Sequence, residues 1–513
     1  MSGFVQSLDS CWTIILAIAA VGVAHYLRKP RTPLLPPGPA GLPFIGNIAD
    51  VPFDNHWLKF SELGEVWGDI LSLTVFGRTM IVINSVKVAE DLLEVHGTNF
   101  SDRPVIQMGG ELIGFKNGLS LAQYGNRVRK ERKVFQRFFG SQTSISQFTP
   151  LLTSEIQRLL KNILAHRGDA VNQIRRTMGA ITLRISHGYH ILDQPRQDPF
   201  LEMVETAGKN FASSTKPAAF LVDIVPALRY WPEWLPGGGF HTTAKMWSKQ
   251  LNETLEAVYE YVKKETAMGT AESSFASTLI EEGMHADYLI KWAAASIQAG
   301  GADTTAAQLE AFLLAMSLYP DVQTTAQKEL DAVVGSYRLP QISDRAQLPY
   351  ITALCKEVFR WHVASPTAIP HRSCADFIYE RGEGAAPLLI PKNSLIIPNI
   401  WKMTHDPERY ANPMVFDPTR FIQTDVKAAE PDPFRICFGF GRRICPGKLL
   451  ADTAVFMVCS AFLAVFSISK ATKNGALAEP ALGQTSGTVS HPLPFECSVE
   501  PRNDEALRLI QSD

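Results

Sequence analysis

Apolar residues with a helical spacing dominate this chain of 513 residues. From about Val86 onward they recur every three to four positions, which places them on one face of a helix. The longest such run covers residues 289–318. A second, strongly apolar run at residues 456–469 has only 14 residues, too few to cross a bilayer, and therefore predicts a buried core helix.

Strand patterns are confined to short parts of the chain. Residues 70–76 and 80–84 are β-prone, and Gly77, Arg78 and Thr79 between them predict a hairpin. Residues 388–398 form a second β-prone stretch, which Pro391 interrupts. The pattern as a whole predicts a mainly α fold with a smaller β-sheet region.

The first 40 residues differ from the rest. Residues 11–27 are uncharged and mostly apolar, and as a helix they would extend about 26 Å, near the minimum for a membrane span. Arg28, Lys29 and Arg31 follow, which places the downstream chain in the cytosol by the positive-inside rule. The charges follow the apolar run and no small-residue cleavage site is evident, so an anchor is favoured over a cleaved signal peptide.

Prolines between Pro30 and Pro39 then exclude a helix and predict a stiff spacer. We therefore expect a single N-terminal transmembrane helix within residues 1–27, a proline-rich hinge at residues 28–40, and one catalytic domain at residues 41–513. Length alone would allow about three domains, but no linker divides the chain.

Composition narrows the function further. A hydrophobic share of 46% supports a sizeable core, and a net charge of −2 gives no reason to expect a nucleic acid partner. The seven cysteines are scattered without C-x-x-C pairs, so neither a disulfide framework nor a zinc site is indicated. A reducing cytosolic setting fits this usage and would leave the sequons at Asn99 and Asn252 unmodified.

The most specific motif is FGFGRRICPG at residues 438–447. Phe438, Gly441, Arg443, Cys445 and Gly447 occupy the fixed positions of the pattern F-x-x-G-x-R-x-C-x-G. The two glycines are expected to let the backbone turn tightly and approach the sulfur. Cys437, eight residues before Cys445, lacks this frame and is interpreted as an ordinary buried cysteine.

At these residues the chain resembles the cytochrome P-450 family of haem-thiolate monooxygenases. The resemblance implies the cytochrome P-450 fold and haem b, with Cys445 as the metal ligand. It also implies O2 and NADPH-derived electrons as co-substrates. A thiolate ligand pushes electron density onto the iron and favours O–O cleavage, and residues 41–513 become a haem-binding catalytic domain.

A second motif, AGGADTT, lies at the centre of the longest helical run. Gly300 and Gly301 cost about 1 kcal/mol each relative to alanine within a helix, which suggests a close approach to the haem. A threonine hydroxyl that bonds back to a carbonyl can open a helix locally. Asp303 and Thr304 supply an acid and an alcohol, and the resemblance assigns this pair to proton delivery during oxygen activation.

The resemblance also implies structural and cofactor-binding residues. Glu357 and Arg360 share one helix face and are expected to form a buried triad with Arg420, supporting the haem loop rather than catalysis. Arg132, His371 and Arg443 match partners of the two haem propionates. Val128 stands where the family commonly has tryptophan, which removes one expected hydrogen bond to a propionate.

No flavin or nicotinamide motif is present, so the implied partner is a membrane-bound NADPH-cytochrome P-450 reductase, with cytochrome b5 as a further electron donor. The single-pass protein would lie in the endoplasmic reticulum membrane. The expected basic docking residues are Lys130, Lys133, Arg137, Arg442 and Lys448.

By alignment with the family, a mainly apolar substrate pocket is expected at residues 105–113, 211–225, 296–302, 365–369 and 485–489. This pocket indicates a lipophilic small molecule, and further stretches resemble fungal members that oxidise secondary metabolites such as terpenoids and polyketides. The primary hypothesis is a hydroxylase. The alternatives are a reductase-independent haem-thiolate isomerase or dehydratase, a non-catalytic haem-bearing ligand binder and, weakest, a cysteine hydrolase.

Overall fold

The computed structural model describes residues 34–52, 54–193, 197–217, 219–382, 384–473 and 476–512. The expected membrane anchor, residues 1–27, and residues 28–33 of the expected hinge lie outside the described residues. Helices make up most of the described chain, in agreement with the predicted fold class. The helices are α2 (His56–Trp67), α3 (Val86–Glu90), α4 (Gly97–Phe100), α5 (Asn126–Phe139), α6 (Gln142–Ser146), α7 (Thr149–Ala165), α8 (Ala170–His187), α9 (Pro199–Thr215), α10 (Leu221–Ile224), α11 (Phe240–Met268), α12 (Phe275–Glu282), α13 (Asp287–Leu318), α14 (Pro320–Val333), α15 (Pro349–Trp361), α16 (Ile400–Thr404), α17 (Lys448–Val465) and α18 (Asp504–Gln511).

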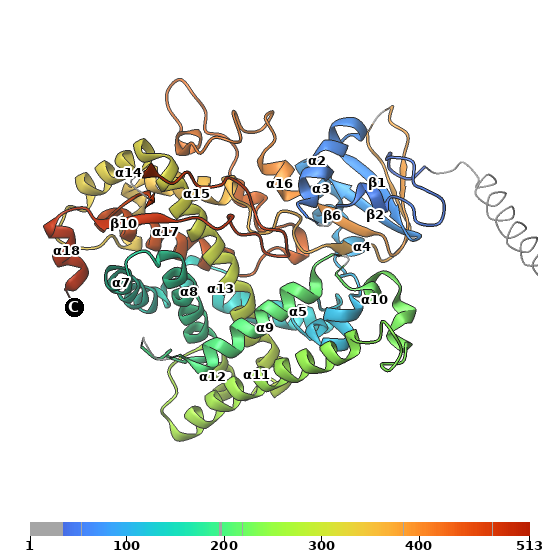
Figure 1. Ribbon diagram of the computed structural model, residues 1–513, viewed down its shortest axis with the longest axis horizontal. Coiled ribbons are helices and arrows are strands. Elements are labelled where there is room, and N and C mark those ends of the chain that lie inside the picture. Colours follow the sequence, from blue (N-terminus) through green and yellow to red (C-terminus); the bar gives the residue numbers. More distant parts are fainter. Residues whose placement is uncertain are drawn as a thin grey trace, which may run out of the picture.

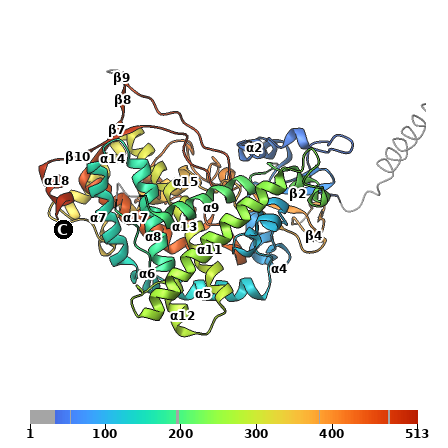
Figure 2. The same cartoon turned by 60° about the horizontal axis from the view of Figure 1, so that its bottom comes forward.

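The fold has a region that contains the main β-sheet and a larger helical region. Figure 1 shows β1, β2 and β6 with α2 and α3 at one end, and the long helices at the other. Figure 2 shows the same arrangement after a rotation, with β8 and β9 on an arm that extends away from the helices. The strands are β1 (Ile70–Val75), β2 (Arg78–Ile83), β3 (His371–Arg372), β4 (Phe377–Tyr379), β5 (Leu388–Ile390), β6 (Leu395–Pro398), β7 (Phe466–Lys470), β8 (Thr472–Lys473), β9 (Ala476–Leu477) and β10 (Cys497–Pro501).

The predicted hairpin is formed by β1 and β2, with a shorter turn than expected. The two strands pair antiparallel from Ile70 opposite Ile83 to Val75 opposite Arg78. The turn therefore consists of Phe76 and Gly77, which both have positive φ, 46° and 77°. Such a two-residue turn matches the right-handed twist of paired strands, so residues 78 and 79 belong to the second strand.

The second β-prone stretch completes the main sheet. It contains β5 and β6, and Pro391 follows the end of β5, as predicted. Strand β6 pairs in parallel with β2 and antiparallel with β3, which gives the order β1-β2-β6-β3. The sheet thus joins the N-terminal part of the chain to segments more than 280 residues later.

Helix α13 confirms the longest predicted run, and its C-terminal half, residues 305–317, is buried on all sides. At its centre, Ala299, Gly300 and Asp303 remain exposed. The helix contacts α8, α15 and α17, the other long elements of the core. An opening in the packing therefore coincides with Gly300, the first of the two central glycines.

The short apolar run at residues 456–469 is only partly helical. Helix α17 ends at Val465, and the next residues form β7, in which buried and exposed positions alternate and Ser467 faces outward. The period of two fits a strand rather than a helix. Within the described residues, α17 has the length and apolar character of a membrane span. However, 72% of residues 448–465 is buried inside the protein, so α17 is a core helix as predicted.

The expected ion-pair triad is present and completely buried. Both carboxylate oxygens of Glu357 accept hydrogen bonds from the Arg360 guanidinium, at 2.7 and 2.8 Å. Arg420 donates to Glu357 at 3.1 Å and to a second carboxylate, Glu430, at 2.8 Å. The two arginines are thereby balanced by two carboxylates, one of which the sequence did not indicate.

The network fixes the segment before the cysteine motif. The backbone N–H of Asp417 donates to Glu357 at 2.9 Å, and the N–H of Glu430 donates to the Arg420 carbonyl at 2.7 Å. These contacts hold residues 411–430 against α15. Since the cysteine motif follows directly, the network sets the position from which that loop begins.

We expect Glu357→Gln to lower the free energy of unfolding by about 3–5 kcal/mol, because two buried guanidiniums lose their shared counter-charge. Urea-induced unfolding of the purified protein measures the change. The matched control is Lys356→Met on the same helix, which breaks a partly exposed ion pair with Asp432 and should cost less than about 1 kcal/mol. Equal small losses in both variants would contradict a stabilising role for the network.

Candidate functional site

The cysteine motif forms a tight loop in front of α17. The N–H of Cys445 donates to the carbonyl of Phe438 at 2.8 Å, which closes the loop. Gly441 has a φ of 56°, and a Cβ at this position would collide with the carbonyl of Leu93. Glycine at position 441 therefore permits close packing against Leu93. The sequence had instead predicted that this glycine lets the backbone approach the sulfur. A Cβ on Gly447 would lie at an ordinary contact distance, 3.9 Å, from Cys445 Sγ.

Burial and nearby positive charge have opposite effects on the pKa of the Cys445 thiol. Burial raises the pKa of its thiol, while the N–H of Gly447 and the charges of Arg132 and Lys448 lower it. The side chain nevertheless keeps accessible surface. Burial and accessible surface are both accounted for when Sγ faces an internal space enclosed by protein. A metal bound in that space would further stabilise the thiolate.

Aromatic residues connect this loop to α15. Phe359 of α15 packs its ring on Phe434 and Phe438, with centroids 5.0 and 5.3 Å apart. The thiol of Cys437 donates to the Phe359 carbonyl at 3.3 Å, and burial raises its pKa to about 12. Cys437 is thus the ordinary buried cysteine that its sequence context predicted.

Buried cationic groups gather beside the loop. Arg443 donates to the carbonyls of Ser101, Leu119 and Ala122 at 2.8, 3.3 and 2.6 Å. Arg132 of α5 donates to the carbonyl of Ile444 at 2.6 Å. The arginines expected from the sequence at this site therefore meet in the structure.

A further arginine, Arg103, completes this cationic cluster, which we define as Arg103, Arg132 and Arg443. Arg103 is buried and donates to the carbonyls of Ile369 and Pro370, while its Nε has no partner. Sequence reasoning missed its role. The available signal was an arginine within the tetrapeptide SDRP, beside a stretch expected to line the pocket.

Within the described residues, the guanidinium groups of the cluster donate to backbone carbonyls and to no carboxylate. Asp102 and Glu131 act on Arg443 through their charge, but their ion pairs are with Arg372 and Arg127. Burial and the charge of Arg132 lower the pKa of Arg443 to about 10, and burial with Arg443 lowers that of Arg103. Because buried charges need counter-charges, the site fits a dianionic group such as the two propionates of haem.

Neutral His371 and Val128 offer no free hydrogen-bond donor to a haem propionate. His371 Nδ1 donates to the carbonyl of Phe100 at 2.6 Å, and burial with the charge of Arg103 lowers its pKa well below the usual value. A neutral His371 therefore has no N–H left for an anion and can donate only when protonated. Val128 is fully buried in the helical core and offers no polar atom.

The centre of α13 presents the predicted alcohol and acid. Thr304 Oγ1 donates to the carbonyl of Gly300 at 2.7 Å, as expected. A Cβ on Gly300 would meet no atom within 4 Å, whereas one on Gly301 would lie 2.9 Å from Thr182 of α8. Gly301 therefore permits close packing against α8, and its expected approach to the cofactor stays a prediction. Asp303 is half-exposed, and its Oδ1 lies 3.1 Å from His491 Nε2.

Four of the five expected pocket segments come together. Thr488 shares a hydrogen bond of 2.9 Å with Thr215, and its carbonyl accepts one of 3.3 Å from Ser365. The Met108 N–H of the first segment donates to Asp223 Oδ1 of the second at 2.8 Å, and apolar contacts join these two segments with the fourth. The residues of this apolar cluster include Ile106, Met108, Ile113, Phe211, Phe220, Val222, Ala295 and Ile369.

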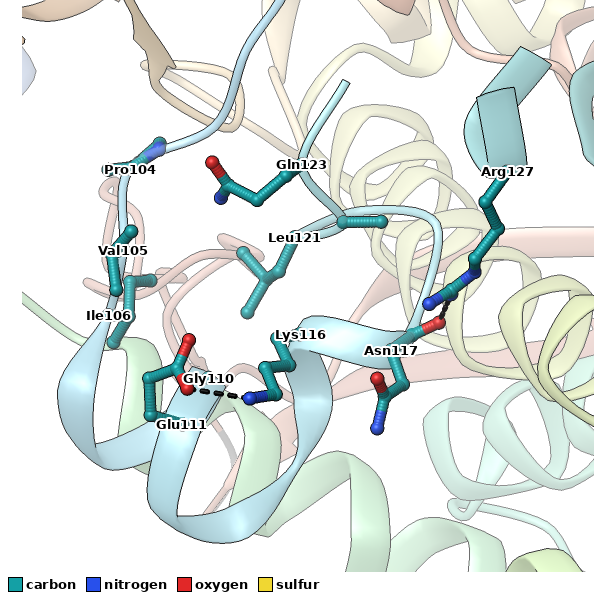
Figure 3. Close-up of a pocket in the computed structure, with 11 residues that line it drawn as sticks. Pro104, Val105, Ile106, Gly110, Glu111, Lys116, Asn117, Leu121, Gln123 and Arg127 are labelled. Atoms are coloured by element: carbon teal, nitrogen blue, oxygen red, sulfur yellow. Dashed lines mark hydrogen bonds and ion pairs between the residues drawn. The ribbon is translucent and has the colours of Figure 1, made fainter. Parts of the chain in front are cut away.

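A cavity with mixed polar and apolar lining adjoins the first of these segments (Figure 3). It has a volume of about 230 Å³ and lies between Val105 and Ile106 on one side and Leu121 and Gln123 on the other. An ion pair of 2.6 Å between Lys116 and Glu111 crosses its lining. Cys445, Asp303 and Thr304 are not among its lining residues, so it is separate from the cysteine face.

A cysteine loop, a buried cationic cluster and a central helix with an acid–alcohol pair together define the class of haem-thiolate enzymes. The family model for cytochrome P-450 matches residues 36–498. The chain therefore belongs to the cytochrome P-450 family.

Curated fungal relatives support this assignment along the whole chain. The chain is 43% identical to cytochrome P-450 monooxygenase 208 of Postia placenta, covering 97% of this chain and 96% of the relative. It is also 43% identical to cytochrome P-450 monooxygenase claR of Ampulloclitocybe clavipes, over 93% and 89%. The tryptamine 4-monooxygenase of Psilocybe cyanescens is 36% identical, over 97% and 99%.

The family defines the reaction class. The protein is a haem-thiolate monooxygenase of fungal secondary metabolism, with haem held by a cysteine thiolate and with O2 and NADPH-derived electrons as co-substrates. Enzymes of this family use a redox partner and a small-molecule substrate. The monooxygenase class of the primary hypothesis is thus confirmed, and hydroxylation as the particular reaction stays a prediction.

Replacing Arg103 should weaken haem retention more than protein folding. Loss of a charge-assisted hydrogen bond of about 1.5–3 kcal/mol predicts that Arg103→Gln releases haem about tenfold to a hundredfold faster. Transfer of haem to an apo-globin acceptor measures the rate. Arg129→Gln, at an exposed position of α5, is the control and should not change it. Equal rates for wild type and Arg103→Gln would remove Arg103 from the haem site.

Proposed function

We propose that Cys445 provides the thiolate of this monooxygenase and that the cationic cluster holds the haem propionates. The observation that carries the proposal is the unbalanced positive charge buried beside the cysteine loop. Phe438, Gly441 and Gly447 shape the loop, and the Glu357 network fixes its start. His371 would add a donor to a propionate only after the bound anion had raised its lowered pKa enough to protonate the ring.

Haem bound through the thiolate would supply O2 activation, in which one oxygen atom goes to the substrate and the other leaves as water with two NADPH-derived electrons and two protons. The chain supplies proton delivery and positioning. Asp303 and Thr304 are proposed to provide an acid and an alcohol on the exposed face of α13. Gly300 leaves this face open, and the threonine hydroxyl is directed by its bond to the Gly300 carbonyl.

The substrate is proposed to be a lipophilic terpenoid or polyketide. Three of the pocket segments meet in an apolar cluster, and the polar contacts of the segments involve the hydroxyl groups of Thr215, Ser365 and Thr488 and the carboxylate of Asp223. Such a lining favours apolar binding with a small number of orienting hydrogen bonds. Catalysis would then place one C–H bond of the bound molecule near the cysteine face.

NADPH-cytochrome P-450 reductase, with cytochrome b5 as a further donor, is the proposed electron partner. Lys130 and Lys133 are exposed on α5, whose Arg132 contacts the cysteine loop. Arg442 is also exposed. The other two expected docking residues are less available, because Arg137 pairs with Glu282 and Lys448 donates to the Phe434 carbonyl. The proposed docking face therefore reduces to Lys130, Lys133 and Arg442.

Residues 1–27 and 28–40 are proposed as anchor and hinge in the endoplasmic reticulum membrane, with residues 41–513 as the cytosolic catalytic domain. Exposed apolar side chains support this orientation. Phe44, Tyr230 and Trp234 are 79, 78 and 82% exposed. The hairpin and α10 lie at the same end of the molecule (Figure 1), where Arg78 donates to the Asp223 carbonyl at 2.9 Å. This end would meet the bilayer surface.

Oxygen-18 labelling tests the function. With reductase, NADPH and a fungal metabolite extract, wild-type protein should add one labelled oxygen atom from 18O2 to a lipophilic product. Cys445→Ser should be inactive, while Cys437→Ser, eight residues earlier in the same loop, should retain activity. Turnover of the substrate without NADPH, or labelling by Cys445→Ser, would contradict the proposal.

The same assay tests the docking face. Lys130→Glu with Lys133→Glu should raise the reductase concentration needed for half-maximal rate, and the effect should shrink at high salt. Lys328→Glu on α14, an exposed control at the opposite end of the helical region, should behave as wild type. An unchanged requirement in the double variant would place the reductase elsewhere.

Membrane fractionation tests the anchor. Full-length protein should stay in the membrane pellet after alkaline carbonate, whereas a chain that begins at residue 28 should be extracted. Replacing Tyr230 and Trp234 by serine in the shortened chain should further reduce its binding to vesicles, because it removes exposed aromatic surface. Carbonate resistance of the shortened chain would disprove the anchor.

A further inference from the structure

An unexpected histidine lies between two carboxylates of the central helix. His491 Nε2 is 3.1 Å from Asp303 Oδ1, and its Nδ1 is 3.1 Å from Glu310 Oε2. The two acids are seven residues apart on α13, which places them on the same face two turns apart. One imidazole ring therefore bridges the proposed proton donor and a second, buried acid.

The outer end of this network is also fixed. Glu310 is 3% exposed and accepts two hydrogen bonds from Arg175 of α8, at 2.6 and 3.0 Å. Burial raises the pKa of Glu310, but the bonds from His491 and Arg175 outweigh it and lower the value. Glu310 thus supplies a firmly held negative charge to one side of the histidine.

The backbone of His491 belongs to the segment that carries part of the proposed pocket wall. Its N–H donates to Thr485 Oγ1 at 2.9 Å, and its carbonyl accepts from the Thr485 N–H at 2.8 Å. Between these residues, Thr488 contacts Thr215 and Ser365. The ring of His491 accordingly ties a substrate-facing loop to the proton-donor helix.

We infer that His491 is a positioning residue for catalysis, a doubly hydrogen-bonded cation that fixes Asp303 and the pocket loop in one arrangement. This inference rests on the proposed role of Asp303. A ring that donates from both nitrogens must be protonated. Once it loses a proton, it can donate to only one of the two carboxylates, and the arrangement loosens.

The charged surroundings favour the protonated ring. Burial lowers the pKa of His491, but the bonds to Asp303 and Glu310 raise it to about 9 overall. The other titratable groups nearby are Arg175, with Glu205 beyond it, and His362 at the end of α15. Burial lowers the pKa of His362 to about 4, so this neighbour is neutral at the pH of the experiment.

The first experiment compares His491→Gln, Asp303→Asn and the double variant in reconstituted holoenzyme. We expect His491→Gln to lower kcat about tenfold or more, since misplacement of a reacting group has such effects, with electrons diverted to peroxide and KM within about twofold. The double variant should equal Asp303→Asn, because both changes act on one group. His190→Gln, which breaks an exposed contact with Glu272, is the control and should match wild type.

The outcomes separate the two claims. If Asp303→Asn stays fully coupled, the proposed relay fails. If Asp303→Asn uncouples but His491→Gln changes only KM, the relay stands and this inference is overturned, because His491 then acts on the pocket loop alone. Wild-type coupling should also fall as pH rises through about 9, and His491→Gln should show no such fall.

A second readout does not depend on turnover. The pKa of His491 is raised from about 6.5 in the unfolded chain, so its stabilisation is fully present below that pH and is lost as pH rises through about 9. The melting temperature of His491→Gln should lie roughly 2–4 °C below wild type at pH 6.5, and the gap should close toward pH 10. A gap that is absent or independent of pH would refute the cationic clamp.

Discussion

The need to neutralise buried positive charge governs the centre of this protein. Arg103, Arg132 and Arg443 converge beside the cysteine loop and bond to backbone carbonyls. Desolvated cations of this kind are costly unless an anion joins them. The proposed binding of a dianionic cofactor here would complete the charge balance and place the cofactor beside the thiol. By comparison, the other buried arginine pair, Arg360 with Arg420, carries its own carboxylates and serves as a fixed support.

The cationic cluster would bind the cofactor, whereas the Glu357–Arg360–Arg420 network positions the segment before the cysteine loop. The self-contained network ties α15 to the segment before the loop, and Phe359 passes this constraint to Phe434 and Phe438. Among the described residues, the cationic cluster has no carboxylate hydrogen-bonded to its guanidinium groups, and its counter-charge would come from a bound anionic group. Separately, the central face of α13 presents Thr304 and Asp303, and His491 links that face to the pocket loop. Charge pairing thus sets the geometry in both places.

The sequence predicted those features that depend on local spacing. The cysteine motif, the long central helix, the hairpin and the Glu357–Arg360 pair are all encoded within short segments, and the structure contains each of them. Their limits were less certain: α17 ends where period-two burial begins, and the hairpin turn needs positive φ at Phe76 as well as at Gly77.

Features that depend on distant partners could not be predicted in the same way. Arg103, Glu430 and His491 owe their roles to groups that adjoin them only in the folded chain, such as Ile369 for the first and Asp303 for the last. Gly301 likewise carried a signal, an expensive glycine in a helix, but its reason lies in Thr182 of α8.

The central claim is that the Cys445 thiolate, and no other sulfur, faces the cofactor held by the cationic cluster. The carbon monoxide difference spectrum of the reduced holoprotein tests this most directly. Wild type and Cys437→Ser should both show the far-red Soret band of thiolate ligation, and Cys445→Ser should lack it. Retention of that band by Cys445→Ser, or its loss in Cys437→Ser with haem still bound, would contradict the account.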